Sequence, residues 1–211
     1  MVDVNERGIL INARLLAPGD EPVRATITVT NQRDGHSVQV PVTISPDPYW
    51  YTFDDDYIAA YAAEVLRLVN ELRAERGVQP VSYVFEAQEC ANARSAELAV
   101  SFSHTRPDGS DCLTITDEYG LYVEPDEWGK IHRFRMENII SNGGGYKSNA
   151  GIPTSPESLA EILVRDWNNS GGHRGNMLYP TNNEMVVGLY VDENGSIYSA
   201  QWFGDTAEFF R

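Results

Sequence analysis

Residues 167–178 read Trp-Asn-Asn-Ser-Gly-Gly-His-Arg-Gly-Asn-Met-Leu and follow directly on a predicted helix. Gly171 and Gly172 would let the chain leave that helix sharply and bring the imidazole of His173 back toward the body of the domain. His173 therefore either faces a cleft or only ties down a glycine-rich turn. Ser170 could act with it as a nucleophile, but a turn-stabilising hydrogen bond is the simpler explanation, since the chain lacks a Gly-x-Ser-x-Gly motif.

A second unusual segment, residues 102–109, reads Phe-Ser-His-Thr-Arg-Pro-Asp-Gly. It follows another predicted helix, and a loop at a helix end can present His104 toward a cleft; alternatively, His104 only complements the helix C-terminus. Glu137 lies between apolar residues at the end of a predicted strand, where a partly desolvated carboxylate needs a histidine, an arginine or a metal ion. An ordinary ion pair with Arg133 or Arg135 is the alternative.

Four segments, taken in order, resemble the CAP superfamily, which holds the cysteine-rich secretory, antigen 5 and pathogenesis-related proteins and many bacterial relatives. They are residues 102–109, Glu137-Asn138-Ile139, residues 167–178 and the closing Gln201-Trp202-Phe203-Gly204. Each motif alone is weak, but the four in this order are specific. The resemblance is to the bacterial branch and covers about residues 54–205.

The resemblance implies an α/β/α sandwich with a central cleft. In many members that cleft holds two histidines and two acidic residues, and the histidine pair can bind a divalent metal such as zinc. Carried over by motif, these positions match His104, His173 and Glu137. The second acidic residue of the family follows the tryptophan, where this chain has Asn168-Asn169-Ser170. Two imidazoles and one carboxylate leave water to complete a zinc shell, which describes a weak or open site.

Three helices are predicted from residue 54 onward. The first has Asp54 at its start, apolar residues three and four apart, and Gly77 at its end. The second runs from about Phe85 to Ser101. The third runs from Pro156 to Asn169, with proline at a favourable first position.

Strands are predicted over residues 131–140, 185–191 and 196–203, and the last two flank Asn194-Gly195, a hairpin signal. Two segments between these elements read as loops: residues 105–129 and 141–154. The order helix, helix, strand, helix, hairpin predicts an α+β fold in which helices cover a small antiparallel sheet.

The first 47 residues predict a short all-β module that precedes the CAP-like domain, 48–211. Apolar and polar residues alternate over 25–30 and 37–44, a period that buries one face of a sheet, and Asp34-Gly35 lies between them as a turn. A third strand is predicted within Gly8–Leu16, and Pro41 indicates an edge strand. The module resembles part of an immunoglobulin-like sandwich.

The chain has 31 acidic and 16 basic residues and a net charge of −15. This charge argues against nucleic-acid and anionic-membrane partners. No apolar run reaches the roughly 20 residues of a membrane span. The first residues show no signal peptide and read as an internal start of a longer protein.

Cys90 and Cys112 form one bridge if their Cα atoms lie within about 7 Å; otherwise they are small buried thiols. His36 and His132 are expected at the surface.

Three functions are compatible with these residues. The favoured one is a secreted or cell-surface interaction module, whose partner is an extracellular protein or cell-envelope ligand, because surface proteins often join such domains to β modules. The second is a peptidase-like hydrolase that uses His104, Glu137, His173 or Ser170. The third is a small-ligand or lipid carrier, although the acidic, polar loops offer no obvious apolar groove. No cofactor is required except, in the metal-bound case, a divalent ion such as zinc.

Overall fold

The structure is a computed structural model that describes residues 2–4, 10–13, 21–31, 33–45, 53–126, 129–141, 155–192 and 196–205. The chain divides into two compact units, residues 1–52 with 148–155 and residues 53–147 with 156–211. The domain boundary predicted after residue 47 lies outside the described residues, as do the predicted Asn194-Gly195 turn and most of the predicted loop over 141–154.

The described residues of the first unit form two antiparallel strand pairs. Strands β1 (Val2–Val4) and β2 (Leu10–Ala13) pair antiparallel, as do β3 (Val23–Thr30) and β4 (Ser37–Ile44). The predicted β3–β4 hairpin is confirmed, and Gly35 supplies the positive φ of +71° that its turn needs. The predicted buried face is only partly buried: Ala25 and Ile27 are half-buried, whereas Val29 and Val38 are 55% and 64% exposed. A two-stranded sheet cannot by itself bury one of its faces completely.

A four-stranded sheet forms the centre of the second unit, in the order β5 (Ser82–Tyr83), β9 (Glu184–Val191), β10 (Ile197–Gly204) and β8 (Met136–Ser141). β5 runs parallel to β9, and the other pairs are antiparallel. The central strands are buried on both faces: Val187 belongs to one hydrophobic cluster, and its neighbour Val186 to the other. This explains their nearly continuous apolar sequence.

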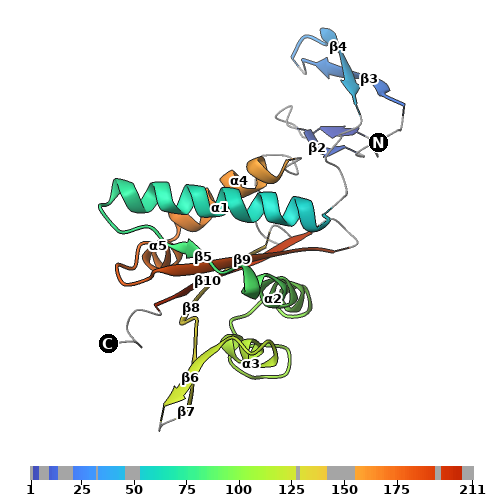
Figure 1. Cartoon of the computed structure of the whole chain (residues 1–211). Helices are drawn as coiled ribbons and strands as arrows, with labels where there is room; N and C mark the ends of the chain where they lie inside the picture. The colour runs from blue at the N-terminus through green and yellow to red at the C-terminus, as the bar shows by residue number, and fades with distance from the viewer. Residues whose placement is uncertain are drawn as a thin grey trace. The chain divides into compact units, whose positions relative to one another are not determined.

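Helices cover both faces of this sheet (Figure 1), so the predicted α+β sandwich is confirmed. α1 (Asp55–Glu75), α4 (Pro156–Asn169) and the short α5 (Gly171–Met177) lie on one face, and α2 (Gln88–Val100) lies on the other. Asp54 begins α1 by accepting a hydrogen bond of 3.0 Å from the backbone nitrogen of Tyr57. The second predicted helix starts with a 3₁₀ turn, η1 (Phe85–Ala87), before α2.

Helix α2 lies very close to the sheet. A Cβ atom built on Gly188 in β9 would lie 2.0 Å from the carbonyl oxygen of Ala91 in α2. Only a glycine permits this approach, which fixes the position of α2 and of every side chain that it carries toward the sheet.

A buried arginine anchors the chain that follows α5. Arg73, at the end of α1, donates hydrogen bonds to the backbone carbonyls of Gln79, Met177, Tyr179 and Asn182. Burial lowers the pKa of this guanidinium, and the four carbonyl dipoles compensate its charge. The end of α5 is thereby held against α1.

Three predictions about the middle of the chain are wrong. The strand predicted over 131–140 is interrupted: β7 (Gly129–His132) pairs with β6 (Tyr122–Asp126) in a separate sheet, and β8 begins at Met136. The predicted loop over 105–129 contains η2 (Cys112–Thr114) and α3 (Ile115–Glu118) as well as β6. Because β6 is rich in Glu, Pro and Asp, its sequence is not typical of a strand. Gly171 and Gly172, predicted as a turn, instead begin α5.

Candidate functional site

The carboxylate of Glu137, on β8, is surrounded by nitrogen donors. Its side chain is only 2% exposed. Arg94 donates from Nε to Oε1 at 2.8 Å, and Trp202 donates from Nε1 to the same oxygen at 3.1 Å. His104 Nδ1 lies 2.8 Å from Oε2, and Arg94 Nη2 lies 3.4 Å from it. Both carboxylate oxygens therefore have partners, one of which is a buried cation.

The fold brings these side chains together from three elements. Glu137 and Trp202 are register partners on β8 and β10, so they share the face of the sheet that α2 covers. Arg94 projects from α2 onto that face and is completely buried. The guanidinium also donates to the backbone carbonyl of Ser103, which holds the segment beyond α2 and places His104 beside Glu137.

The structure thus brings His104 and Glu137 together but pairs the carboxylate with Arg94. The predicted alternative, an ordinary ion pair, is present, but its partner is Arg94. Arg133 instead binds Glu86 and Glu184 at 2.7 Å each. Arg94 was missed because it lies on the apolar stripe of its helix. That position was itself a signal, since an arginine on a buried helix face needs an acidic or carbonyl partner.

His173 is the third residue of α5 and is half-buried. Its backbone carbonyl accepts a hydrogen bond of 3.1 Å from Asn138 Nδ2, and Asn138 Oδ1 accepts one of 2.9 Å from Asn176. Asn138, the neighbour of Glu137 on β8, therefore connects α5 to β8 by hydrogen bonds. Burial, followed by the nearby charge of His104, lowers the pKa of His173, so the two imidazoles lie within electrostatic reach of each other.

Ser170 occupies the N-cap position of α5, but its side chain makes no capping hydrogen bond. The turn-stabilising bond predicted for it is therefore absent from the first turn of the helix. Of the other histidines, His36 is exposed as expected. His132 is half-buried, with Nδ1 3.0 Å from Thr116 Oγ1, so its expected surface position is only partly correct.

Cys112 is a further neighbour of this carboxylate. Sγ of Cys112, a nitrogen of His104 and an oxygen of Glu137 all lie within 4.8 Å of one another, and among the described residues they form a group that could hold a metal ion. Burial, reinforced by the charge of Glu137, raises the pKa of the Cys112 thiol to about 12. Cys90 and Cys112 are both buried free thiols, so the disulfide alternative is wrong.

Comparison with known proteins identifies the second unit. Residues 66–203 match CAP, the cysteine-rich secretory protein family. The chain belongs to this family. The uncharacterized protein YkwD of Bacillus subtilis strain 168 is 26% identical to the CAP chain over 149 residues, 70% of this chain and 48% of YkwD. The chain thus spans about half the length of this relative.

Several solved structures are similar to the CAP chain, including the following two. The CAP domain of Enterococcal PrgA has a TM-score of 0.51 and 15% identity, over 73% of this chain and 64% of that one. An extracellular protein containing an SCP domain from Bacillus anthracis strain Ames has a TM-score of 0.49 and 16% identity, over 78% of this chain and 46% of that one. The PrgA likeness supports the sandwich fold. Among the described residues, no helix is long and apolar enough to cross a membrane.

Of the three side chains that form the group able to hold a metal ion, His104 suits the role of a direct ligand, whereas Glu137 and Cys112 do not. Glu137 is a poor direct ligand, because a metal ion would compete with the buried guanidinium of Arg94 for its oxygens. Cys112 would first have to lose a strongly held proton. The imidazole of His104 fits well: Nδ1 faces the carboxylate and therefore carries the hydrogen, which leaves the Nε2 lone pair for a ligand.

Proposed function

We propose that this CAP domain is a binding module of the cell exterior or cell surface, and that it holds a divalent metal ion such as zinc on the imidazoles of His104 and His173. The hydrogen bond of 2.8 Å between His104 Nδ1 and Glu137 is the observation that carries the metal proposal. In this role Glu137 orients the imidazole of His104 and makes it more basic, as carboxylates that are hydrogen-bonded to metal-binding histidines do.

The state of the two rings supports the proposal. The side chain of His104 is 57% exposed although its carboxylate partner is buried, so the ring can meet an ion from solvent. A lowered pKa keeps His173 neutral at physiological pH, and only a neutral imidazole binds a metal. Two imidazoles with water in the remaining positions make an open site, which suits exchange of ligands.

The proposed location and partner rest on the family and on charge. The match to the cysteine-rich secretory protein family favours a protein that works outside the cytoplasm. A net charge of −15 favours an extracellular protein or a cell-envelope ligand over nucleic acid. Fractionation of cells that express the natural gene, followed by detection of the protein, tests this location; recovery from the cytoplasm alone contradicts it.

Thermal unfolding of chelator-treated protein, with and without Zn²⁺, tests the metal site. A gain of about 2.7 kcal/mol is expected at a hundredfold excess over Kd. His104→Gln and His173→Gln should each abolish it, whereas His132→Gln, a matched control, should not. Glu137→Gln should weaken zinc binding by roughly 10- to 100-fold, as loss of such supporting carboxylates does.

Cys112→Ala separates the two metal arrangements that the residues allow. It should leave zinc binding unchanged if the imidazole pair is the site. If Cys112→Ala abolishes binding and His173→Gln does not, the ion is held by His104, Cys112 and Glu137, and the proposal is wrong. Absence of any zinc-dependent shift removes the metal role altogether.

A further inference from the structure

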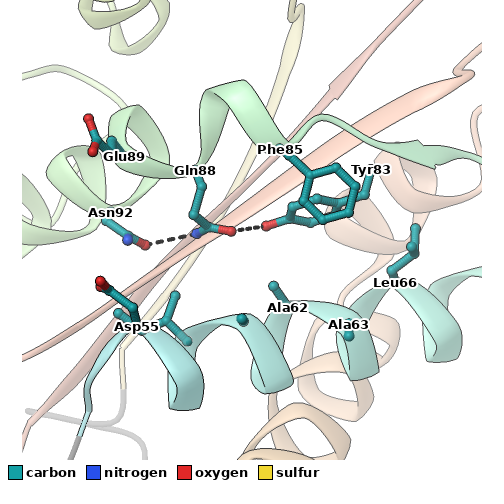
Figure 2. Close-up of a pocket in the computed structure, with 11 residues that line it drawn as sticks. Asp55, Ala62, Ala63, Leu66, Tyr83, Phe85, Gln88, Glu89 and Asn92 are labelled. Atoms are coloured by element: carbon teal, nitrogen blue, oxygen red, sulfur yellow. Dashed lines mark hydrogen bonds between the residues drawn. The ribbon is translucent and has the colours of Figure 1, made fainter.

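A separate pocket opens between α1 and the start of α2, beside β5 (Figure 2). Its volume is about 300 Å³, at the lower end of the range for small-molecule sites. Tyr83, at the end of β5, lies at this edge of the sheet, whereas Glu137 lies on β8 at the opposite edge. The pocket is lined by α1, β5, η1 and α2, not by the acidic, polar loops in which no apolar groove was expected.

Most of the pocket wall is apolar. Helix α1 contributes Ala62, Ala63 and Leu66, and Phe85 and Tyr83 close one end (Figure 2). The two rings pack edge to face with centroids 5.1 Å apart. Phe85 is 79% exposed, an unusual position for a large apolar side chain and one from which it can cover a ligand.

The polar side chains along the opposite wall bind one another. Gln88 donates 3.0 Å to Asn92 Oδ1 and 2.9 Å to the carbonyl of Val187, and it accepts a hydrogen bond from the hydroxyl of Tyr83. These groups form a fixed surface (Figure 2). Because the Gln88 side chain and the Tyr83 hydroxyl already have hydrogen-bond partners, they contribute little to the choice of ligand.

Charge is confined to the end of the pocket opposite the aromatic rings. Asp55 and Glu89 both lie there, one from α1 and one from α2 (Figure 2). Neither carboxylate forms an ion pair with a basic group among the described residues, unlike Glu137. Both carboxylates lie in the first turns of their helices, whose dipoles offset part of their charge. A ligand that reaches this end still meets two carboxylates without a basic partner among the described residues, on a chain whose net charge is −15.

We propose that this pocket binds a small organic cation, an amine carried on a short aromatic or aliphatic body. The body packs against α1 and Phe85, and the ammonium group lies at Asp55 and Glu89. A pocket of about 300 Å³ has the volume of about ten water molecules in the liquid, which limits the ligand to roughly ten non-hydrogen atoms. The proposal does not depend on the metal site.

Titration of the whole ¹⁵N-labelled chain with phenethylamine tests the proposal. Its uncharged analogue 2-phenylethanol and the anion 3-phenylpropanoate serve as comparisons of similar shape. The amine should shift the amide signals of Ala63 and Phe85, with a Kd of about 1 mM for so small a ligand. The alcohol should bind roughly fivefold to tenfold more weakly, the value of one ion pair in a solvated site, and the anion should not bind.

Two variants locate the ligand. Ala63→Leu fills the pocket from an exposed helix position that tolerates leucine, and it should abolish binding of both amine and alcohol. Ala74→Leu, at an exposed position of α1 outside the pocket, is the matched control. Glu89→Gln should weaken only the amine, whereas Glu161→Gln on α4 should leave its affinity unchanged.

Equal affinity for amine and alcohol overturns the proposal, as does binding that survives Ala63→Leu. The amide spectrum of each variant shows whether it is folded. If Ala63→Leu does not fold, Glu89→Gln decides alone, and an unchanged amine affinity in that variant contradicts the assigned position of the ammonium group.

Discussion

Replacing Arg94 with methionine removes the buried cation from the centre of the His104–Glu137 site. Methionine keeps most of the volume and the helix propensity of arginine, so the change acts mainly on charge and hydrogen bonding. The carboxylate of Glu137, only 2% exposed, then keeps Trp202 and His104 as its nitrogen donors. Removing one partner of a buried pair costs about 3–5 kcal/mol. We expect about 3 kcal/mol, the lower end, because two donors remain.

This loss corresponds to a fall in Tm of roughly 6–12 °C for a domain of this size. Urea unfolding followed by tryptophan fluorescence measures it directly, because Trp202 itself contacts the carboxylate. The double variant Arg94→Met with Glu137→Gln should be more stable than Arg94→Met alone, since an amide needs no cationic partner. A double-mutant cycle isolates this coupling.

The control is the same substitution in an exposed ion pair. Arg67 on α1 binds Glu64 and Glu71, and half of its side chain is exposed, so Arg67→Met should change stability little. If Arg94→Met costs no more than Arg67→Met, or if the double variant is no more stable than the single one, the buried charge does not organise this site and the reasoning fails.

Three further predictions concern close packing, thiol reactivity and pH. Gly188→Ala should destabilise the fold by about 3 kcal/mol or more, because the added methyl group would lie 2.0 Å from a carbonyl oxygen of α2; calorimetry measures the loss. Cys90 and Cys112, whose thiol pKa values are raised by burial to about 12, should resist alkylation at pH 8, where roughly one thiol in ten thousand is ionised, until denaturant is added. In metal-free protein, His173 has a pKa below its ordinary 6.5, so its contribution to stability is complete above that pH and is lost as the pH falls below it. NMR titration of His104→Asn should show the pKa of His173 rising, but not to its ordinary value, since burial is the larger cause.

Local signals in the sequence were sufficient for the long elements of the fold. Asp54 and Gly77 mark the limits of α1 because capping and positive φ are properties of single residues. The spacing of apolar residues predicted α4 and the strand pair β9–β10, because this spacing is also a local property of the sequence. Helix α5 was missed because Gly171 and Gly172 disfavour a helix in isolation. The contacts of Asn138 with His173 and Asn176 hold it, and these come from a distant strand.

The candidate site could be predicted from the sequence only where its residues belong to recognisable motifs. His104 and Glu137 could be named because each stands in an unusual local sequence. Arg94 and Cys112 could not be placed beside them, because only the packing of α2 and η2 around β8 brings these residues to one carboxylate. A sequence motif identifies individual side chains. Which groups compensate a buried charge such as that of Glu137 depends on the three-dimensional packing of all the elements around it.

Helix α2 connects the two proposed sites and also makes them separable. Gln88 and Glu89 at its start line the amine pocket, and Arg94 farther along binds Glu137 at the other edge of the sheet. The close approach at Gly188 fixes the helix between them, so neither site can move it to affect the other. Ala63→Leu should therefore leave zinc affinity unchanged while it abolishes amine binding. A change in both affinities would mean that α2 shifts on the sheet, which the packing at Gly188 forbids.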